Sequence, residues 1–92
     1  MNEAERQEKL KKLEEYRTLI DKFDDVFALT LLARTATAKA IGEMKRELNI
    51  PVEDPEREKK VIERVTKDKT EEEKQIIIEF YDKIFEISKR VQ

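Results

Sequence analysis

The chain has 92 residues, so we expect one domain at most, with a small core of its own. Of these residues 38% are hydrophobic and 46% are charged, and the apolar residues recur at helical spacing. One glycine and two prolines leave little from which to build hairpin turns. This composition predicts an all-α fold and excludes β architectures.

Two residue types that most enzymes use are missing. The sequence has no histidine and no cysteine, which excludes a zinc finger, a Ser-His-Asp triad, a Cys/His pair and a haem site held by either residue. The single glycine, Gly42, cannot form a phosphate-binding loop. A net charge of −2 gives no support for binding nucleic acid through a basic surface. We therefore expect no metal ion and no nucleic-acid partner.

The N-terminal segment is charged and lacks the apolar core of a signal peptide. No later stretch approaches the roughly 20 apolar residues of a membrane span. The absence of cysteine agrees with a reducing compartment. We expect a soluble cytoplasmic protein that does not associate with membranes.

Residues 2–48 are predicted to form one helix, because no proline or turn cluster interrupts them. Arg34 lies on the apolar stripe of this helix, where an aliphatic residue would be expected. At 1.5 Å per residue the helix would be roughly 65–70 Å long, too long for a compact monomer of this size. It must be half exposed or pack along a partner, and the near-3.5 period of the stripe suits antiparallel pairing. The stripe consists of Leu10, Leu13, Tyr16, Ile20, Phe23, Phe27, Leu31, Ala38, Ile41, Met44 and Leu48.

Two shorter helices are predicted over residues 55–67 and 71–91. Pro51 ends the first helix, because proline disfavours the α conformation of the residue before it. Asp54 is a suitable N-cap for the second helix, with Pro55 as its first residue. Thr70 and Glu73 have the spacing of a capping box at the start of the third.

Arg34 and Lys45 are the first candidate site residues. They are eleven positions apart, which is three helical turns, so they point in nearly the same direction about 16 Å apart. Two long cationic side chains could close around a small anion over a floor formed by Ala38 and Ile41. The alternative is that Arg34 pairs with a carboxylate and Lys45 is a solvated surface charge.

Further polar residues share faces with apolar ones in the two shorter helices. Glu58 is in line with Val61 and Val65, and Arg57 precedes it near the start of the helix. The alternative is that both are first-turn charges that are solvated or interact with the helix dipole. Ser88 and Gln92 continue an apolar face of the third helix. For Gln92, the alternative is that the last turn of the helix simply frays. Singly, none of these residues specifies a function.

Taken together, these residues resemble the all-helical AroQ class of chorismate mutases. The resemblance covers about residues 13–92, with the segments "YRTLIDKFD", "LLARTATAKAIGEMKRELNIPVEDPEREKKVIERV" and "IFEISKRVQ". Its most specific part runs from Arg34 through Gly42 to Lys45 and on to the "DPERE" helix start. The resemblance implies conversion of chorismate to prephenate, a step of phenylalanine and tyrosine biosynthesis, without a cofactor.

The resemblance also implies eight substrate-binding residues, of which Arg34, Lys45, Glu58 and Gln92 would be catalytic. Lys45 and Gln92 would donate hydrogen bonds to the ether oxygen of chorismate. Asp54 and Glu58 would hold the ring hydroxyl. The residues expected to bind the two carboxylates are Arg17, Arg34, Arg57 and Ser88.

Arg17 requires a second chain. It is seventeen residues from Arg34, roughly 25 Å along a straight helix, so the two cannot contact one small ligand from the same helix. In an antiparallel dimer, Arg17 of one protomer would lie beside Arg34 and Lys45 of the other, giving two equivalent sites. The expected architecture is therefore an intertwined, antiparallel homodimer with a long, a short and a medium helix in each chain.

Two alternatives to the mutase remain at this stage. One is a lyase of the same fold that removes pyruvate from isochorismate. That branch typically lacks a glutamate after the arginine of the second helix, so Glu58 favours the mutase. The other is a non-catalytic helical dimerisation or regulatory module, which would explain the stripe and the charges but not eight polar matches.

Overall fold

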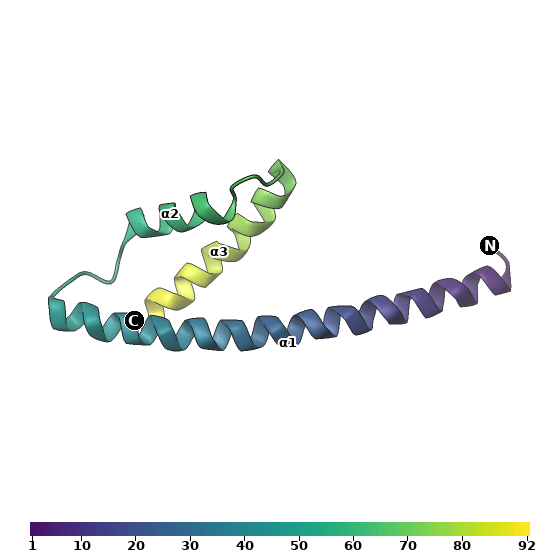
Figure 1. The fold of residues 1–92 in the computed structure, drawn as a ribbon, viewed down its shortest axis with the longest axis horizontal. Helices are drawn as coiled ribbons and strands as arrows, with labels where there is room; N and C mark the ends of the chain where they lie inside the picture. The colour runs from purple at the N-terminus through teal and green to yellow at the C-terminus, as the bar shows by residue number, and fades with distance from the viewer. The chain divides into compact units, whose positions relative to one another are not determined.

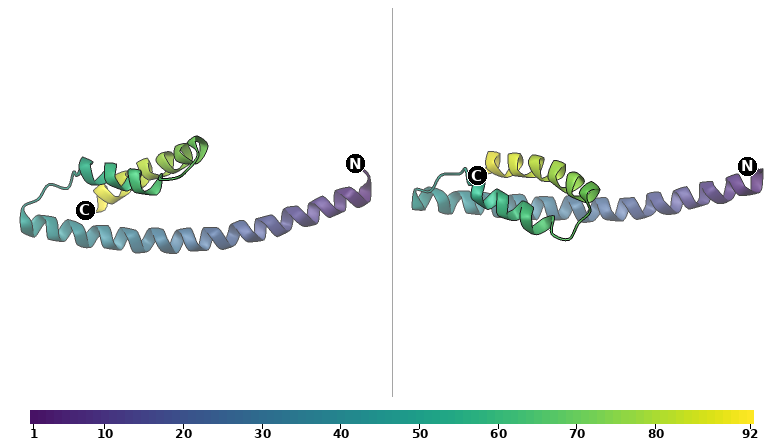
Figure 2. Two further views of the ribbon diagram at one scale, coloured as in Figure 1. Left: turned by 45° about the horizontal axis from the view of Figure 1, so that its top comes forward. Right: turned by 90° about the horizontal axis from the view of Figure 1, so that it is seen from above.

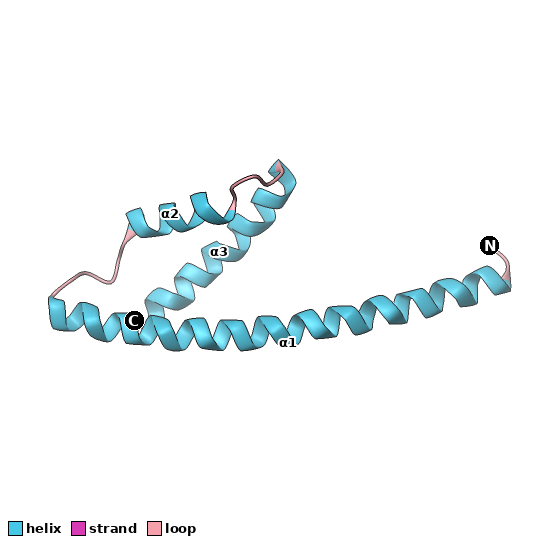
Figure 3. Cartoon of the chain, in the orientation of Figure 1, coloured by secondary structure: helices cyan, strands magenta, loops and turns pink.

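The computed structural model describes residues 1–92 and contains only helices and the loops between them (Figures 1 and 3). The helices are α1 (Glu3–Leu48), α2 (Pro55–Val65) and α3 (Glu71–Val91). The prediction of an all-α chain with a long, a short and a medium helix is confirmed. No helix combines the length and apolar character needed to cross a membrane.

The ends of α1 are set by two asparagines. The Asn2 side-chain oxygen accepts a hydrogen bond from the Glu5 main-chain N–H at 2.8 Å, so Asn2 caps the helix instead of beginning it. At the other end Asn49 adopts a φ of 56°, and the Ile50 N–H donates to the Lys45 carbonyl at 2.8 Å. This left-handed cap ends α1 before Pro51 is reached.

α2 ends at Val65, two residues before the expected boundary at residue 67. Thr66 is the C-cap, and its main-chain N–H and hydroxyl both donate to the Ile62 carbonyl, at 3.0 and 2.6 Å. Asp68 then takes a φ of 59°, which ordinary helix residues do not adopt. The start of α2 agrees with the prediction, because Asp54 caps it and Pro55 is its first residue.

The contacts within the chain group it into two compact units, Met1–Ala33 and Arg34–Gln92, which are described separately. In the Met1–Ala33 unit every residue is exposed. Phe23 keeps 52% of its surface exposed and Val26 keeps 62%. The stripe predicted for this part of α1 is therefore not buried by the chain's own residues. Its exposed large apolar residues are Met1, Leu10, Leu13, Tyr16, Leu19, Ile20, Phe23, Val26, Phe27, Leu29, Leu31 and Leu32.

The Arg34–Gln92 unit contains the core. α2 and α3 run in opposite directions as a hairpin, and the end of α3 returns to the last turns of α1 (Figure 2). The core is small: Ala38 of α1, Val61 of α2 and Ile84 of α3 are its buried apolar residues. Ser88 is buried beside them at 8% exposure. Three helices thus meet at a point where a polar side chain is held inside.

The capping box at the start of α3 makes a testable contribution to stability. The Thr70 main-chain N–H donates to the Glu73 carboxylate at 2.9 Å, and the Thr70 hydroxyl accepts from the Glu73 N–H at 3.1 Å. The bond from the Thr70 main chain, with smaller effects of the Thr70 side chain and Lys69, holds the pKa of Glu73 below its ordinary value of 4.5. A lowered pKa means that the stabilisation is present above the unfolded-state pKa and is lost as the pH falls through the folded-state value.

We therefore expect Glu73→Gln to be less stable than the parent chain at pH 7. The difference should shrink as the pH falls through the lowered pKa of Glu73, because the parent loses the same charge. Urea unfolding at a series of pH values measures this difference. Glu72→Gln is the control, because Glu72 lies in the same first turn but takes no part in the capping box. A difference that stays constant with pH would contradict the assignment.

Candidate active site

One cavity of about 460 Å³ lies within the Arg34–Gln92 unit. Residues of all three helices and of the loop before α2 enclose it, and seven of the eight predicted site residues are among them. The cavity is lined by Arg34, Thr37, Ala38, Ile41, Lys45, Val52, Asp54, Arg57, Glu58, Val61, Phe85, Ser88, Lys89 and Gln92.

The lining combines an apolar floor with a surplus of positive charge. Four cationic and two acidic side chains face the cavity, which leaves two positive charges uncompensated. Ala38, Ile41, Val61 and Phe85 supply apolar surface between them. Cavities of this kind, apolar with a few placed polar groups, are typical of small-molecule sites. The charge balance suits a small ligand with two negative charges.

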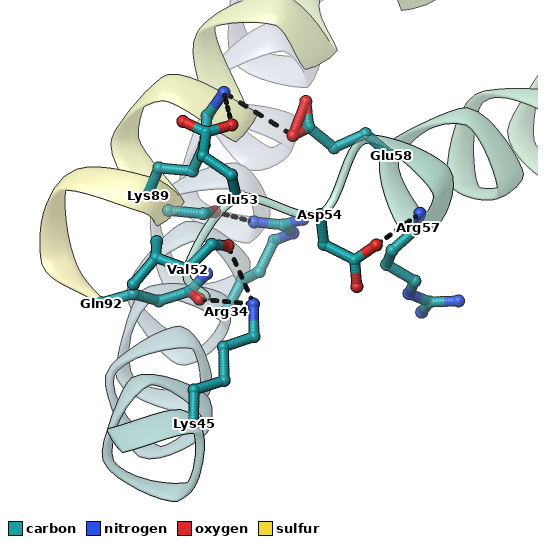
Figure 4. A network of polar contacts seen from close by, with 10 residues as sticks. Arg34, Lys45, Val52, Glu53, Asp54, Arg57, Glu58, Lys89 and Gln92 are labelled. Atoms are coloured by element: carbon teal, nitrogen blue, oxygen red, sulfur yellow. Dashed lines mark hydrogen bonds and ion pairs between the residues drawn. The ribbon is translucent and has the colours of Figure 1, made fainter. Parts of the chain in front are cut away.

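Lys45 and Gln92 form one polar end of the cavity (Figure 4). The Lys45 ammonium donates to the Gln92 side-chain oxygen and to the Val52 carbonyl, both at 3.0 Å. An ammonium group has three N–H donors, so one remains for a ligand. Since the Gln92 amide oxygen is occupied by Lys45, the NH₂ group of the same amide is the donor it can offer. Lys45 is partly buried and bonded within the site, and is not a solvated surface charge.

Arg34 and Ser88 form a second pair across the cavity. The Arg34 guanidinium donates to the Ser88 hydroxyl, which is buried. The partner of Arg34 is thus a hydroxyl and not a carboxylate, so its charge is not neutralised there. The guanidinium has five N–H donors in a planar fork, a geometry that matches a carboxylate.

Asp54 has a structural task in addition to any role toward a ligand. Its Oδ1 atom accepts from the Arg57 main-chain N–H at 3.0 Å and so caps α2. The second carboxylate oxygen remains available to a hydroxyl donor in the cavity. The Arg57 side chain also lines the cavity and, like Arg34 and Lys45, has no carboxylate partner within the chain.

Lys89 belongs to the site although the sequence pattern did not indicate it. Its ammonium lies 3.6 Å from a carboxylate oxygen of Glu58 and 3.6 Å from one of Glu53 (Figure 4). The Glu58 side chain is only 28% exposed, so this ion pair restricts its orientation at the cavity wall. The partners lie more than thirty residues apart in sequence, and a lysine next to Ser88 carries no periodic signal that would reveal them.

Arg17 is the one predicted site residue outside the cavity lining. It belongs to the Met1–Ala33 unit, where its guanidinium pairs with Glu14 at 2.6 Å. The side chains of both residues are about two thirds exposed, at 63% and 68%. An exposed i, i+3 pair of this kind contributes little to stability, so Arg17 can exchange it for another anion at small cost.

Comparison with known proteins identifies two relatives that each match more than half of this chain. The chain is 40% identical over 58 residues to a chorismate mutase of Methanocaldococcus jannaschii, a match that covers 63% of this chain and 59% of that protein. It is 38% identical over 56 residues to a bifunctional chorismate mutase/prephenate dehydratase of Aquifex aeolicus, covering 61% of this chain and 16% of that protein. The matches span less than two thirds of the length of either relative. No solved structure matches the chain.

The family described as chorismate mutase type II matches residues 16–92. This range contains Arg17 and the whole of the cavity lining. The resemblance seen in the sequence is thereby confirmed, and the chain belongs to the type II, AroQ-class chorismate mutase family.

Proposed function

We propose that this chain catalyses the rearrangement of chorismate to prephenate in the cavity of the Arg34–Gln92 unit. The observation that carries the proposal is the gathering of seven of the eight residues implied by the family around one cavity with a surplus of positive charge. They come from three helices and a loop, so their convergence does not follow from the spacing of any one helix.

Binding would use the uncompensated cations. Chorismate carries two carboxylates, and the Arg34 and Arg57 guanidinium groups each have donors to spare for one of them. The Ser88 hydroxyl accepts from Arg34 and so has its own proton to donate to the same carboxylate. Two anchored carboxylates would hold the substrate in the compact conformer that reacts, which lowers the entropic part of the barrier.

The chemical step breaks a carbon–oxygen bond and forms a carbon–carbon bond within one molecule. No nucleophile, electron or proton has to enter or leave, so a site without histidine or cysteine lacks nothing that the reaction needs. The remaining Lys45 N–H and the Gln92 NH₂ would donate to the ether oxygen as it becomes electron-rich. The Val52 carbonyl and the Gln92 side-chain oxygen fix the ammonium before substrate arrives, so little reorganisation is required.

The ring hydroxyl would meet the two acidic residues. The unused Asp54 oxygen and the Glu58 carboxylate both face the cavity and can accept a hydrogen bond. The Lys89 ammonium, 3.6 Å from a Glu58 carboxylate oxygen, restricts the orientation of that carboxylate. This acceptor pair favours the mutase over a lyase acting on isochorismate, because that branch typically lacks a glutamate at the position of Glu58.

We further propose that two chains form an antiparallel homodimer in which Arg17 of each protomer enters the site of the other. The support is the surface of the Met1–Ala33 unit. Residues 26–33 contain no charged side chain, and all eight are exposed. A helix segment that is almost entirely apolar is normally buried, and a second copy of the same helix supplies the matching surface.

The first prediction concerns the two central cations. We expect the purified protein to convert chorismate to prephenate, and Arg34→Ala and Lys45→Ala each to lower kcat/KM by at least about a hundredfold, since each removes a charge-stabilising donor. Loss of chorismate and formation of prephenate are followed directly, and circular dichroism confirms that the helices persist. Arg64→Ala and Lys39→Ala, which change exposed residues outside the cavity, serve as controls. Full activity of Arg34→Ala would refute the site assignment, and pyruvate release from isochorismate alone would favour the lyase.

The second prediction separates the two tasks of Asp54. Asn is as good an N-cap as Asp, so Asp54→Asn should keep the stability of the parent chain while raising KM. Asp54→Ala should raise KM and also lower the free energy of unfolding by about 1 kcal/mol, the usual loss for a removed cap. Urea unfolding and steady-state kinetics on both variants decide this. Equal kinetics for Asp54→Asn and the parent would leave Asp54 with a capping role alone.

The third prediction tests the shared site. Arg17→Ala and Arg34→Ala should each be nearly inactive, whereas the two variants unfolded and refolded together should regain about a quarter of the parent activity. Random pairing would put one chain of each kind in half of the dimers, and each of these mixed dimers would have one intact site out of two. Sedimentation should give a dimer. A monomeric active species, or no recovery on mixing two correctly refolded variants, would contradict the proposal.

A further inference from the structure

The last turn of α3 lies against α1 at its single glycine. Gly42 is buried, and a Cβ atom added there would lie 2.7 Å from the Gln92 Cα and 2.9 Å from the Gln92 main-chain oxygen. Real Cβ atoms do not approach backbone atoms so closely, and backbone cannot rotate away as a flexible side chain can. Any side chain at position 42 therefore has to displace Gln92.

A hydrogen bond holds the same residue from the next turn of α1. The Arg46 guanidinium donates to the main-chain oxygen of Gln92 at 2.7 Å. Arg46 is four residues after Gly42 and so lies on the same face of the helix. The Gln92 N–H in turn donates to the Ser88 carbonyl at 3.1 Å, which keeps the residue in the helical turn. The Gln92 backbone is thus fixed by contact at one point and by hydrogen bonding at two.

Neither Gly42 nor Arg46 lines the cavity. Their effect on it passes through Gln92, whose side-chain oxygen reaches the Lys45 ammonium at 3.0 Å. Lys45 precedes Arg46 directly, so one turn of α1 holds both the backbone and the side chain of Gln92. A shift of the Gln92 backbone would move its amide away from Lys45 and from any ligand atom bound between them.

We propose that Gly42 and Arg46 are positioning residues, which dock the last turn of α3 on α1 so that the Gln92 amide meets Lys45 in the cavity. This inference rests on the proposed mutase function for its kinetic consequences, whereas the docking itself can be measured without substrate. It concerns two residues that do not touch the substrate and act only through Gln92.

The expected effects differ from those of an ordinary helix position. Within a helix, alanine is more favourable than glycine, so Gly42→Ala would raise the melting temperature if the glycine had no other task. If Gly42 docks Gln92, Gly42→Ala should lower kcat at least about tenfold with KM little changed. The reason is that the Gln92 amide donates to charge that develops in the transition state. Arg46→Met should lower kcat in the same way, and Arg46→Lys, which keeps a cationic donor, should recover part of the loss.

The experiment combines kinetics with hydrogen exchange. The parent, Gly42→Ala, Arg46→Met and Arg46→Lys are assayed with chorismate, and amide exchange is measured over residues 88–92 without substrate. Faster exchange there in Gly42→Ala and Arg46→Met, together with the lower kcat, is the expected result. Lys39→Met, an exposed residue of the same helix, is the matched control for loss of a charge from α1. Unchanged exchange in both variants would overturn the inference, whatever their kinetics.

A double-mutant cycle tests whether Arg46 acts through Gln92. If it does, Arg46→Met should have almost no further effect on kcat in a Gln92→Ala background. Independent roles would instead give losses of transition-state stabilisation that add in the double variant. Additive losses would overturn the inference. If the parent chain does not convert chorismate, the proposed function fails, and hydrogen exchange alone still decides whether Gly42 and Arg46 dock the last turn of α3.

Discussion

The contact between the end of α3 and the last turns of α1 is the constraint on which the cavity depends. Arg34, Lys45 and Arg46 of α1 all bond to residues in the last turn of α3, from Ser88 to Gln92. These bonds join groups that are more than forty residues apart in sequence. Because the buried apolar core has only three residues, polar bonds of this kind largely determine how the site residues are positioned. Fully bonded polar groups give directional contacts that a few aliphatic side chains cannot supply.

The local features of the fold could be predicted from the sequence because each depends on residues close together. The Asp54 and Thr70 caps and the first position of Pro55 require only a few neighbouring side chains. The end of α2 lies two residues earlier than predicted, and Asp68 shortly after it adopts a φ of 59°, a conformation that a non-glycine residue rarely takes and that its sequence position does not indicate. For α1, the predicted end at residue 48 agrees with the structure, where the left-handed conformation of Asn49 forms the cap.

The site was predictable where residue type alone carries the information. Arg34 lies on an apolar stripe and Lys45 follows it by three helical turns, and the resemblance to the family implied the other six residues. Lys89, Arg46 and the Val52 carbonyl could not be found in this way, because each depends on how α3 and the loop before α2 approach α1. A main-chain carbonyl also has no signature in the sequence. The predicted roles of the eight site residues remain proposals that the kinetic variants address.

The electrostatics of the cavity explain why three of its four cations have no carboxylate partner in a chain with more acidic than basic residues. The chain has 22 acidic and 20 basic side chains, yet the cavity wall has twice as many cations as carboxylates. The exposed ion pairs Arg17–Glu14, Lys74–Glu71 and Lys83–Glu86 are local, each between residues three apart on one helix. Of the two acids that line the cavity, Asp54 uses one oxygen to cap α2, and Glu58 pairs with Lys89. The positive charge of Arg34, Lys45 and Arg57 therefore has no internal partner that could compete with a dianionic ligand, and the repulsion among these cations is relieved when such a ligand binds.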